Sequence, residues 1–543
     1  MEKENIVEGV IYDPIKKILL PGKIFIEHGI IQRIEQDDRV KEPIILPGFV
    51  DSHIHIESSM LLPVAFSRVA KKHGTIAVVA DPHEIANVAG VEGIDFMISN
   101  SREAEIKFYF GAPSCVPASP FDDCYKIIDA VEIEKLLIRD DIYFLGEMMN
   151  FPGVINSDKE VIKKIEAAKR LGKQVDGHAP GLKDESLSKY IKAGITTDHE
   201  CFTLDEAKEK ISKGMKVLIR EGSAAKNFNT LNPLIEKHPE VIMVCTDDCH
   251  PEDLIEGHIN NLVKRSLTLG YSIFDVLQVV SVNPIKHYNL DLGLLQVGDS
   301  ADFIVVDNLA SLNVLANYIN GVNILEQETT IKQETKKFNL EYTFTKKIEL
   351  EDIKLAQITS TLKVIEVIEG ELVTKEIEYK IKKHSQFVNP DIENDILKIV
   401  VVNRYKDKEV SVGFIKGFGL KKGAIAESIA HDSHHIIAVG VDDASIFKAI
   451  EYVISKKGGL CYFDESNVWG LPLPVYGLIS DEPASIVAEK YKGINSKVSN
   501  DGCNLKAPFM TLSFMALSVI PNLKITPKGL FDVNQFKFID QFI

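Results

Sequence analysis

The chain has 543 residues, of which 45% are hydrophobic and 26% are charged, a balance typical of a soluble globular protein. A single hydrophobic core rarely extends over so long a chain, so we expect two to four domains. The formal net charge of -17 argues against a nucleic-acid backbone or an anionic membrane surface as the main partner, although it leaves a small nucleobase open as a substrate.

The sequence also predicts where the protein works. Its N-terminal segment, MEKENIVEGV, lacks the basic and apolar regions of a signal peptide, and no apolar run reaches the roughly 18 residues that a membrane helix needs. The seven cysteines are odd in number and lack the paired spacing of a disulfide framework. We therefore expect a cytoplasmic protein with reduced thiols and no membrane partner.

The first 45 residues and residues 290–345 share a pattern of short β-type runs separated by turns. Dipeptides such as Pro21-Gly22 and Gly298-Asp299 mark these turns. The first stretch is too short to be stable alone, so we expect residues 1–45 and 290–345 to pair in one small β-sandwich domain. The predicted strands cover residues 5–12, 17–20, 23–26, 294–297 and 301–306.

Between these flanks, residues 46–289 alternate apolar β-type runs with amphipathic helical ones. Two clear helical patterns cover residues 158–171 and 185–193, the second followed by the helix stop Gly194. Eight strands alternating with helices fit a (β/α)8 barrel of the TIM type better than a doubly wound sheet, so the fold class is α/β. The predicted strands cover residues 49–56, 75–80, 107–111, 143–148, 174–177, 195–198, 216–219 and 241–246.

Residues that can bind a metal follow most of these predicted strands. On the first strand, His53 and His55 point to the same face because side chains alternate, and two such imidazoles can hold one metal ion. Each residue taken singly has a plainer interpretation as a helix cap or a loop hydrogen bond. Their occurrence at so many strand ends favours one common site, because the carboxyl ends of barrel strands meet at one face. The strand-end candidates are His53, His55, Asp81, Glu84, Glu147, His178, His199, Asp247 and Asp248.

This set of side chains matches a hydrolytic site with two metal ions, in which a carboxylate bridges the ions and a water molecule is activated. Nitrogen and oxygen ligands of this kind suit Zn, Mn or Fe(II) without choosing among them. The expected roles are one ion on His53 and His55, a second on His178 and His199, Glu147 as the bridge, and Asp247 as a ligand and as the base that accepts the proton of the water.

Residues 346–543 form a third predicted domain of α+β type. It opens with strand-like alternation over residues 347–358 and 362–368. Its segment SIAHDSHH, residues 428–435, has two interpretations. It is either a turn or capped helix start, or a loop that reaches the active site or binds a further metal.

Motifs spread over nearly the whole chain carry a family resemblance. The entry PGFVDSHIH and the tail NPIKHYNLDLGLLQVGDSADFIVVD resemble the amidohydrolase superfamily of metal-dependent barrels. More specific are DPHEIANV, GEMMNFPGV, DGHAPGL, TDHE, CTDD and SIAHDSHH, which look like motifs of the bacterial adenine deaminase family. The sequence has NPI at residues 283–285 where NPA is usual in the superfamily, a difference that affects packing rather than chemistry.

The resemblance implies hydrolytic deamination of adenine to hypoxanthine and ammonia in purine salvage. In that family a glutamate stands where many superfamily members have a carbamylated lysine, and Glu147 occupies this place. The resemblance also implies two divalent metal ions, Mn(II) or Fe(II) ahead of Zn(II). Asp81 and Glu84 match the family's acidic pair, and we expect one of them to protonate ring nitrogen one. The implied metal ligands are His53, His55, Glu147, His178, His199 and Asp247.

Two other functions stay open at this point. The same fold could carry a hydrolase of cyclic amides or of N-acetyl amino sugars. It could also serve as a non-catalytic assembly protein, which predicts missing ligands. In each case we expect a homo-oligomer, with a dimer as the working assumption.

Overall fold

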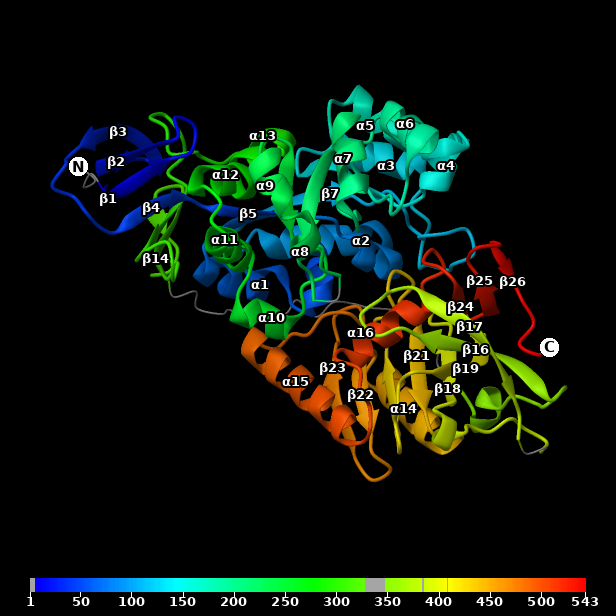
Figure 1. Ribbon diagram of the computed structural model, residues 1–543. Helices are drawn as coiled ribbons and strands as arrows, with labels where there is room; N and C mark the ends of the chain where they lie inside the picture. The colour runs from blue at the N-terminus through cyan, green and yellow to red at the C-terminus, as the bar shows by residue number, and fades with distance from the viewer. Residues whose placement is uncertain (1–4, 224, 328–346, 383–384, 408) are drawn as a thin grey trace. The chain divides into compact units, whose positions relative to one another are not determined.

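The computed structural model describes residues 5–223, 225–327, 347–382, 385–407 and 409–543 (Figure 1). The chain divides into two compact units. The barrel unit contains residues 5–82, 95–115 and 128–327, and the C-terminal unit contains residues 83–94, 116–127 and the described residues from 347 onward. Among the described helices, none is both long and apolar enough to cross a membrane.

Strands from the beginning of the chain and from beyond the barrel form one seven-stranded sheet in the barrel unit, with the order β15-β14-β13-β4-β1-β2-β3. Antiparallel pairing of β4 with β13 joins the two flanks. Alternate buried side chains such as Ile11, Ile24 and Phe303 form its core. Residues 328–345, the end of the predicted flanking domain, lie outside the described residues. The strands are β1 (Asn5–Asp13), β2 (Ile18–Glu27), β3 (Ile30–Gln36), β4 (Ile44–Pro47), β13 (Phe303–Val306), β14 (Val314–Ile319) and β15 (Val322–Asn323).

Two local predictions in this region were wrong. The expected turn at Pro21-Gly22 is continuous strand, because β2 pairs with β1 through both residues. The Val10 N–H, opposite Pro21, donates to the Pro43 carbonyl rather than to β2. The expected strand 294–297 is a loop. Its backbone amides at Leu294 and Gln296 donate to the Asp299 carboxylate rather than to a neighbouring strand.

Eight parallel strands form the barrel, and the predicted (β/α)8 fold is confirmed. Strands β5 to β9 form one continuous sheet and β10 to β12 a second. A hydrogen bond from Thr196 N to Val175 O (2.9 Å) joins the two sheets on one side, and Ile54 pairs with Asp247 on the other. The strands are β5 (Phe49–Ile54), β6 (Thr75–Ala80), β7 (Lys107–Ala112), β8 (Ile142–Met148), β9 (Gln174–Gly177), β10 (Thr197–Asp198), β11 (Lys216–Arg220) and β12 (Ile242–Cys245).

Helices follow the barrel strands in the order that the apolar periodicity predicts. Helix α5 (Lys159–Arg170) buries Val161, Ile165 and Ala168, and the Asp158 carboxylate caps its first turn. Helix α6 (Asp184–Ala193) ends before Gly194, whose φ of 126° suits glycine. The others are α1 (Pro63–Ala70), α2 (His83–Ser101), α3 (Ala130–Leu137), α4 (Phe151–Ile155), α7 (Leu204–Ser212), α8 (Phe228–Leu231), α9 (Pro233–Lys237), α10 (Pro251–Glu256), α11 (Ile259–Thr268), α12 (Ile273–Leu277) and α13 (Asn283–Tyr288).

The C-terminal unit is built on an eight-stranded sheet with the order β17-β16-β19-β18-β21-β20-β22-β23. Helix α14 packs on this sheet through Ile446, Ile450 and Val453 (Figure 1). The predicted strand-like start at residues 347–358 was wrong, because Leu350–Ile353 forms a single 3-10 turn. The elements are β16 (Thr361–Val367), β17 (Thr374–Lys380), β18 (Leu397–Val402), β19 (Val410–Lys416), β20 (Ala424–Glu427), β21 (Ile436–Gly440), α14 (Asp443–Ser455), β22 (Gly459–Phe463), β23 (Val468–Pro472), α15 (Ala484–Asn500), α16 (Pro508–Ser513), β24 (Leu523–Thr526), β25 (Gly529–Asp532) and β26 (Lys537–Phe538).

Candidate metal centre

Two histidines at the end of β5 begin the site. The Nε2 atoms of His53 and His55 lie 3.2 Å apart, and both side chains are buried. The Nδ1 atom of His55 lies 3.0 Å from the Asp81 carbonyl, which can only accept a hydrogen bond. This contact therefore places the proton of a neutral His55 on Nδ1, and the lone pair on Nε2 is left to coordinate a metal ion.

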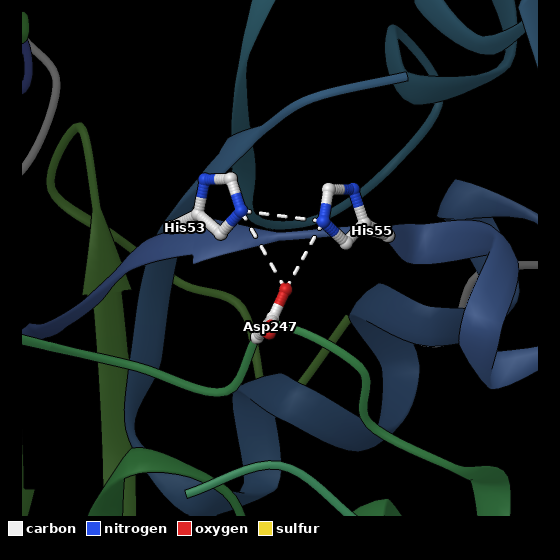
Figure 2. A group of neighbouring side chains, drawn as sticks. All are labelled: His53, His55 and Asp247. Atoms are coloured by element: carbon white, nitrogen blue, oxygen red, sulfur yellow. Dashed lines mark hydrogen bonds and ion pairs between the residues drawn. The ribbon is translucent and has the colours of Figure 1, made fainter. Parts of the chain in front are cut away.

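Closure of the barrel places Asp247 against this pair. The Asp247 amide donates to the His53 carbonyl, and the His55 amide donates to the Asp247 carbonyl, each at 2.9 Å. The Asp247 Oδ1 atom then lies 3.1 Å from His55 Nε2 and 3.6 Å from His53 Nε2. Figure 2 shows the three side chains pointing toward one another. Asp247 has a φ of 57°, a strained value for a residue other than glycine and of a kind that clusters at functional sites.

Glu147, near the end of β8, lies between two pairs of histidines. Its Oε1 atom is 3.2 Å from His55 Nε2 and 3.7 Å from His53 Nε2. Its Oε2 atom is 2.7 Å from His178 Nδ1 and 3.3 Å from His199 Nε2. Each carboxylate oxygen thus faces one pair of imidazoles, which is the arrangement that a bridging ligand needs.

Burial and charge act in opposite directions on the pKa values of Glu147 and Asp247. Burial alone would raise the pKa of Glu147, but the imidazoles of His178, His199 and His55 together hold it well below its usual range. Burial would likewise raise the pKa of Asp247, whereas the Arg220 guanidinium and the nearby imidazoles hold it low. Both carboxylates are therefore charged and available as ligands.

Two residues that the sequence analysis had not assigned to the site also belong to it. The Arg220 guanidinium, at the end of β11, contacts the carboxylates of both Glu200 and Asp247. The Glu200 Oε1 atom lies 3.5 Å from His199 Nε2 and 3.7 Å from His178 Nδ1. Arg220 could have been found by examining the seventh strand end, which had no assigned residue. Glu200 stood beside His199 in the TDHE motif.

The other predicted acidic residues have different surroundings. The Asp81 Oδ2 atom accepts the Glu147 amide at 2.8 Å, so Asp81 supports the backbone at Glu147. The Asp248 carboxylate accepts the Ser58 hydroxyl at 2.5 Å. Asp247 rather than Asp248 therefore contacts the histidines. Glu84 belongs to the C-terminal unit, where its carboxylate contacts the imidazoles of His431 and His434.

The donor atoms of the barrel unit fit a divalent metal. Imidazole nitrogens and carboxylate oxygens that converge on one point can all donate electron pairs to a cation. Imidazole nitrogen and carboxylate oxygen are ligands of borderline metals such as Zn, Mn and Fe(II). Groups of ligand atoms that lie within 4.8 Å of one another in this unit include His53, His55 and Asp247; His53, Glu147 and His199; and His178, His199 and Glu200.

Comparison with known proteins supports the same interpretation. The model of the amidohydrolase family matches residues 44–347, and the model of the adenine deaminase C-terminal domain matches residues 371–537. The chain is 48% identical to an adenine deaminase of Methanosarcina mazei over 98% of this chain and 99% of the relative. It is also 48% identical to one of Sulfurovum sp., over 97% and 98% of the two chains. With an adenine deaminase of Borreliella burgdorferi it shares 44% identity over 98% and 99%.

Proposed function

Because the chain belongs to the amidohydrolase family, and within it to the adenine deaminases, we propose that it hydrolyses adenine to hypoxanthine and ammonia. The observation that carries the proposal is the Glu147 carboxylate between two pairs of imidazoles, in a chain that matches curated adenine deaminases over nearly its whole length. A non-catalytic barrel protein predicted missing ligands, whereas all six expected ligand side chains lie in the described barrel unit.

Two divalent ions, Mn(II) or Fe(II) ahead of Zn(II), would lower the pKa of a water molecule at this site and polarise it for attack on carbon six of the purine ring. His53 and His55 would hold one ion and His178 and His199 the other, with Glu147 between them. Asp247 completes the set through Oδ1, which faces His53 and His55. Arg220 holds the other oxygen of Asp247, so the orientation of this carboxylate is restricted.

The residues of the chain move two protons in the proposed reaction. Asp247 accepts one proton of the attacking water and returns it to the leaving amine, which departs as ammonia. A carboxyl group supplies a proton to ring nitrogen one as the oxygen attacks, and the second proton of the water replaces it. General acids and bases in such sites contribute about 10²–10⁴-fold each. We propose Glu84 as the source of the ring proton, because Asp81 already accepts a backbone hydrogen bond from Glu147.

The physiological setting completes the proposal. We propose a cytoplasmic enzyme of purine salvage that acts on the free base and assembles as a homodimer, with the flanking strands and residues 346–543 as domains separate from the barrel. All seven cysteines are free thiols, as a reducing compartment allows. Light scattering during gel filtration tests the dimer, and a monomer at micromolar concentration would contradict it.

The test begins with metal-free protein, which is reconstituted with Mn(II), or with Fe(II) under reducing conditions, and incubated with adenine. Ammonia release together with a purine spectrum that changes to hypoxanthine is the expected result. Two bound metals without adenine turnover would refute the activity while leaving the metal site intact.

Two variants then separate the roles. Asp247→Asn should lose turnover by several orders of magnitude, and the matched variant Asp248→Asn shows whether the neighbouring carboxylate does the same. Glu84→Gln should lose turnover while both metals stay bound. Near-normal turnover of Glu84→Gln would mean that Glu84 is not the acid.

A further inference from the structure

A cluster of histidines surrounds Glu84 inside the C-terminal unit. Glu84 lies in the first turn of α2, and its partners come from the segment 428–435 that follows β20, about 350 residues later in the chain. His431 Nδ1 lies 3.2 Å from Glu84 Oε1, and His434 Nε2 contacts Glu84 Oε2. Each of the two carboxylate oxygens therefore has its own imidazole from the late segment.

Two further groups complete this cluster. His83 Nε2 lies 3.6 Å from Glu84 Oε1 and 3.2 Å from the Oδ1 atom of Asp432. Glu84 and His434 are 2% and 4% exposed, so water does not compete for these contacts. Among the described residues, only imidazoles form ion-pair contacts with the Glu84 carboxylate.

The backbone of the late segment is held in the shape that directs these imidazoles. Asp432 and His434 have φ values of 59° and 50°, which cost energy in residues other than glycine. The Arg404 guanidinium donates to the His434 carbonyl at 3.2 Å, and the Tyr405 hydroxyl donates to the Ser433 carbonyl at 2.8 Å. The segment is therefore fixed by side chains outside it, which keeps the two imidazoles against Glu84.

The charges of the cluster decide where its proton lies. Burial alone would raise the pKa of Glu84, but the charges of His431 and His434 hold it well below its usual range. Burial lowers the pKa of His434. The Glu84 charge opposes this shift, whereas the Arg404 and His431 charges reinforce it. His83 and Asp432 are the other titratable groups in contact. The protonation of Glu84 is therefore coupled to that of the imidazoles beside it.

We propose that His434 and His431 are positioning residues that act through Glu84, by orienting its carboxylate and sharing the proton that it delivers to the purine ring. The inference rests on the proposed function, in which Glu84 supplies that proton. In this arrangement the Glu84 carboxyl group passes a proton to ring nitrogen one. It takes a proton in return from the neighbouring imidazolium, whose N–H bond breaks. The second proton of the attacking water then restores the imidazolium, so the cluster is unchanged after each turnover.

A double-mutant cycle in the full-length, metal-loaded protein tests this inference. His434→Gln should lower kcat about 10–100-fold with both metals retained, a loss typical of a group that orients a ligand or catalytic side chain. In the Glu84→Gln background, the same change should cost less than about threefold, because the group through which His434 acts is already missing. His431→Gln, in the same cycle, keeps the test decisive if His434→Gln fails to fold.

A pH profile and a matched control distinguish proton sharing from a packing role. The basic limb of kcat against pH should move to higher pH in His434→Gln, because burial raises the pKa of Glu84 and one of the imidazole charges that lower it is then missing. His435 is the matched control, since it is buried in the same segment and its Nδ1 accepts the Arg404 amide rather than facing Glu84. His435→Gln should leave the position of the basic limb unchanged.

Four outcomes would overturn the inference. Losses that multiply in the double variant would show that the histidines act independently of Glu84, and a near-normal kcat in both His434→Gln and His431→Gln would show that they do not act on the reaction. A third equivalent of bound Mn(II) that His434→Gln removes would assign the cluster to a metal instead. Failure of the wild-type protein to release ammonia from adenine is a separate result, which removes the proposed function and this inference together.

Discussion

A buried lysine behind the metal centre allows a quantitative prediction. The Lys210 ammonium, in α7, donates to the Ala179 carbonyl at 2.8 Å, to Asp198 Oδ2 at 2.9 Å and to Glu206 Oε1 at 2.8 Å. Its side chain is fully buried. Burial alone would lower the pKa of Lys210, but the attraction of Asp198 and Glu206 raises it above the usual value. The ammonium is therefore charged and compensates two buried carboxylates.

Lys210→Met keeps the length of the side chain and removes this charge. Removing one partner of a buried ion pair costs about 3–5 kcal/mol, because the remaining charge is left uncompensated. Lys208→Met is the matched control on the same helix. Its ammonium lies 3.9 Å from Asp205 with the lysine side chain half exposed, so the loss there should stay below about 1 kcal/mol.

The same substitution should weaken metal binding, because Asp198 supports the backbone around two expected ligands. Its Oδ1 atom accepts the Ala179 amide at 2.8 Å and its Oδ2 atom accepts the Glu200 amide at 3.1 Å. These amides belong to the residues that directly follow His178 and His199. Loss of such supporting contacts typically lowers metal affinity about 10–100-fold.

Urea titration of the metal-free variants, followed by far-ultraviolet circular dichroism, measures the stability effect. Tryptophan fluorescence is unsuitable, because the single tryptophan, Trp469, belongs to the C-terminal unit. Competition with a chelator measures Mn(II) affinity. If Lys210→Met unfolded within about 1 kcal/mol of Lys208→Met and bound Mn(II) normally, the reasoning about the buried pair would be refuted.

Three further predictions follow from the structure. Removal of metal by a chelator should abolish adenine turnover, and Mn(II) titration should restore it with saturation at two equivalents. Saturation at one equivalent would contradict the proposed bridging role of Glu147. Glu147→Gln should lower the affinity for both ions, because each carboxylate oxygen faces one histidine pair, and metal analysis showing two tightly bound ions would argue against the bridge. Burial lowers the pKa of Lys524 to about 7, from an unfolded value near 10.5. Between these two pH values the unfolded chain binds more protons than the folded chain, so the stability of the protein rises with pH. Lys524→Met should therefore have its largest gain in melting temperature over the wild type at pH 7, and the gain should shrink toward pH 10.

Local sequence patterns were sufficient to predict the barrel and the side chains at its strand ends. The predicted strands at residues 75–80 and 174–177 coincide with β6 and β9, because a buried parallel strand is a short apolar run between turn signals. Alternation along a strand was enough to place His53 and His55 on one face. The turn predicted at Pro21-Gly22 was wrong, because pairing with β1 keeps both residues in an extended strand.

Only the tertiary structure showed which distant residues meet. Barrel closure through Ile54 and Asp247 brings the carboxylate of Asp247, the residue already chosen from the strand-end TD pattern, to 3.1 Å from His55 Nε2. Contacts of Arg220 with Asp247 and of His434 with Glu84 join residues that are 27 and 350 positions apart. Periodicity reports which way a side chain points from its own element, whereas its partner depends on how the elements close around it. For that reason the strand-end candidates could be identified from the sequence, whereas the contacts that each of them makes could not.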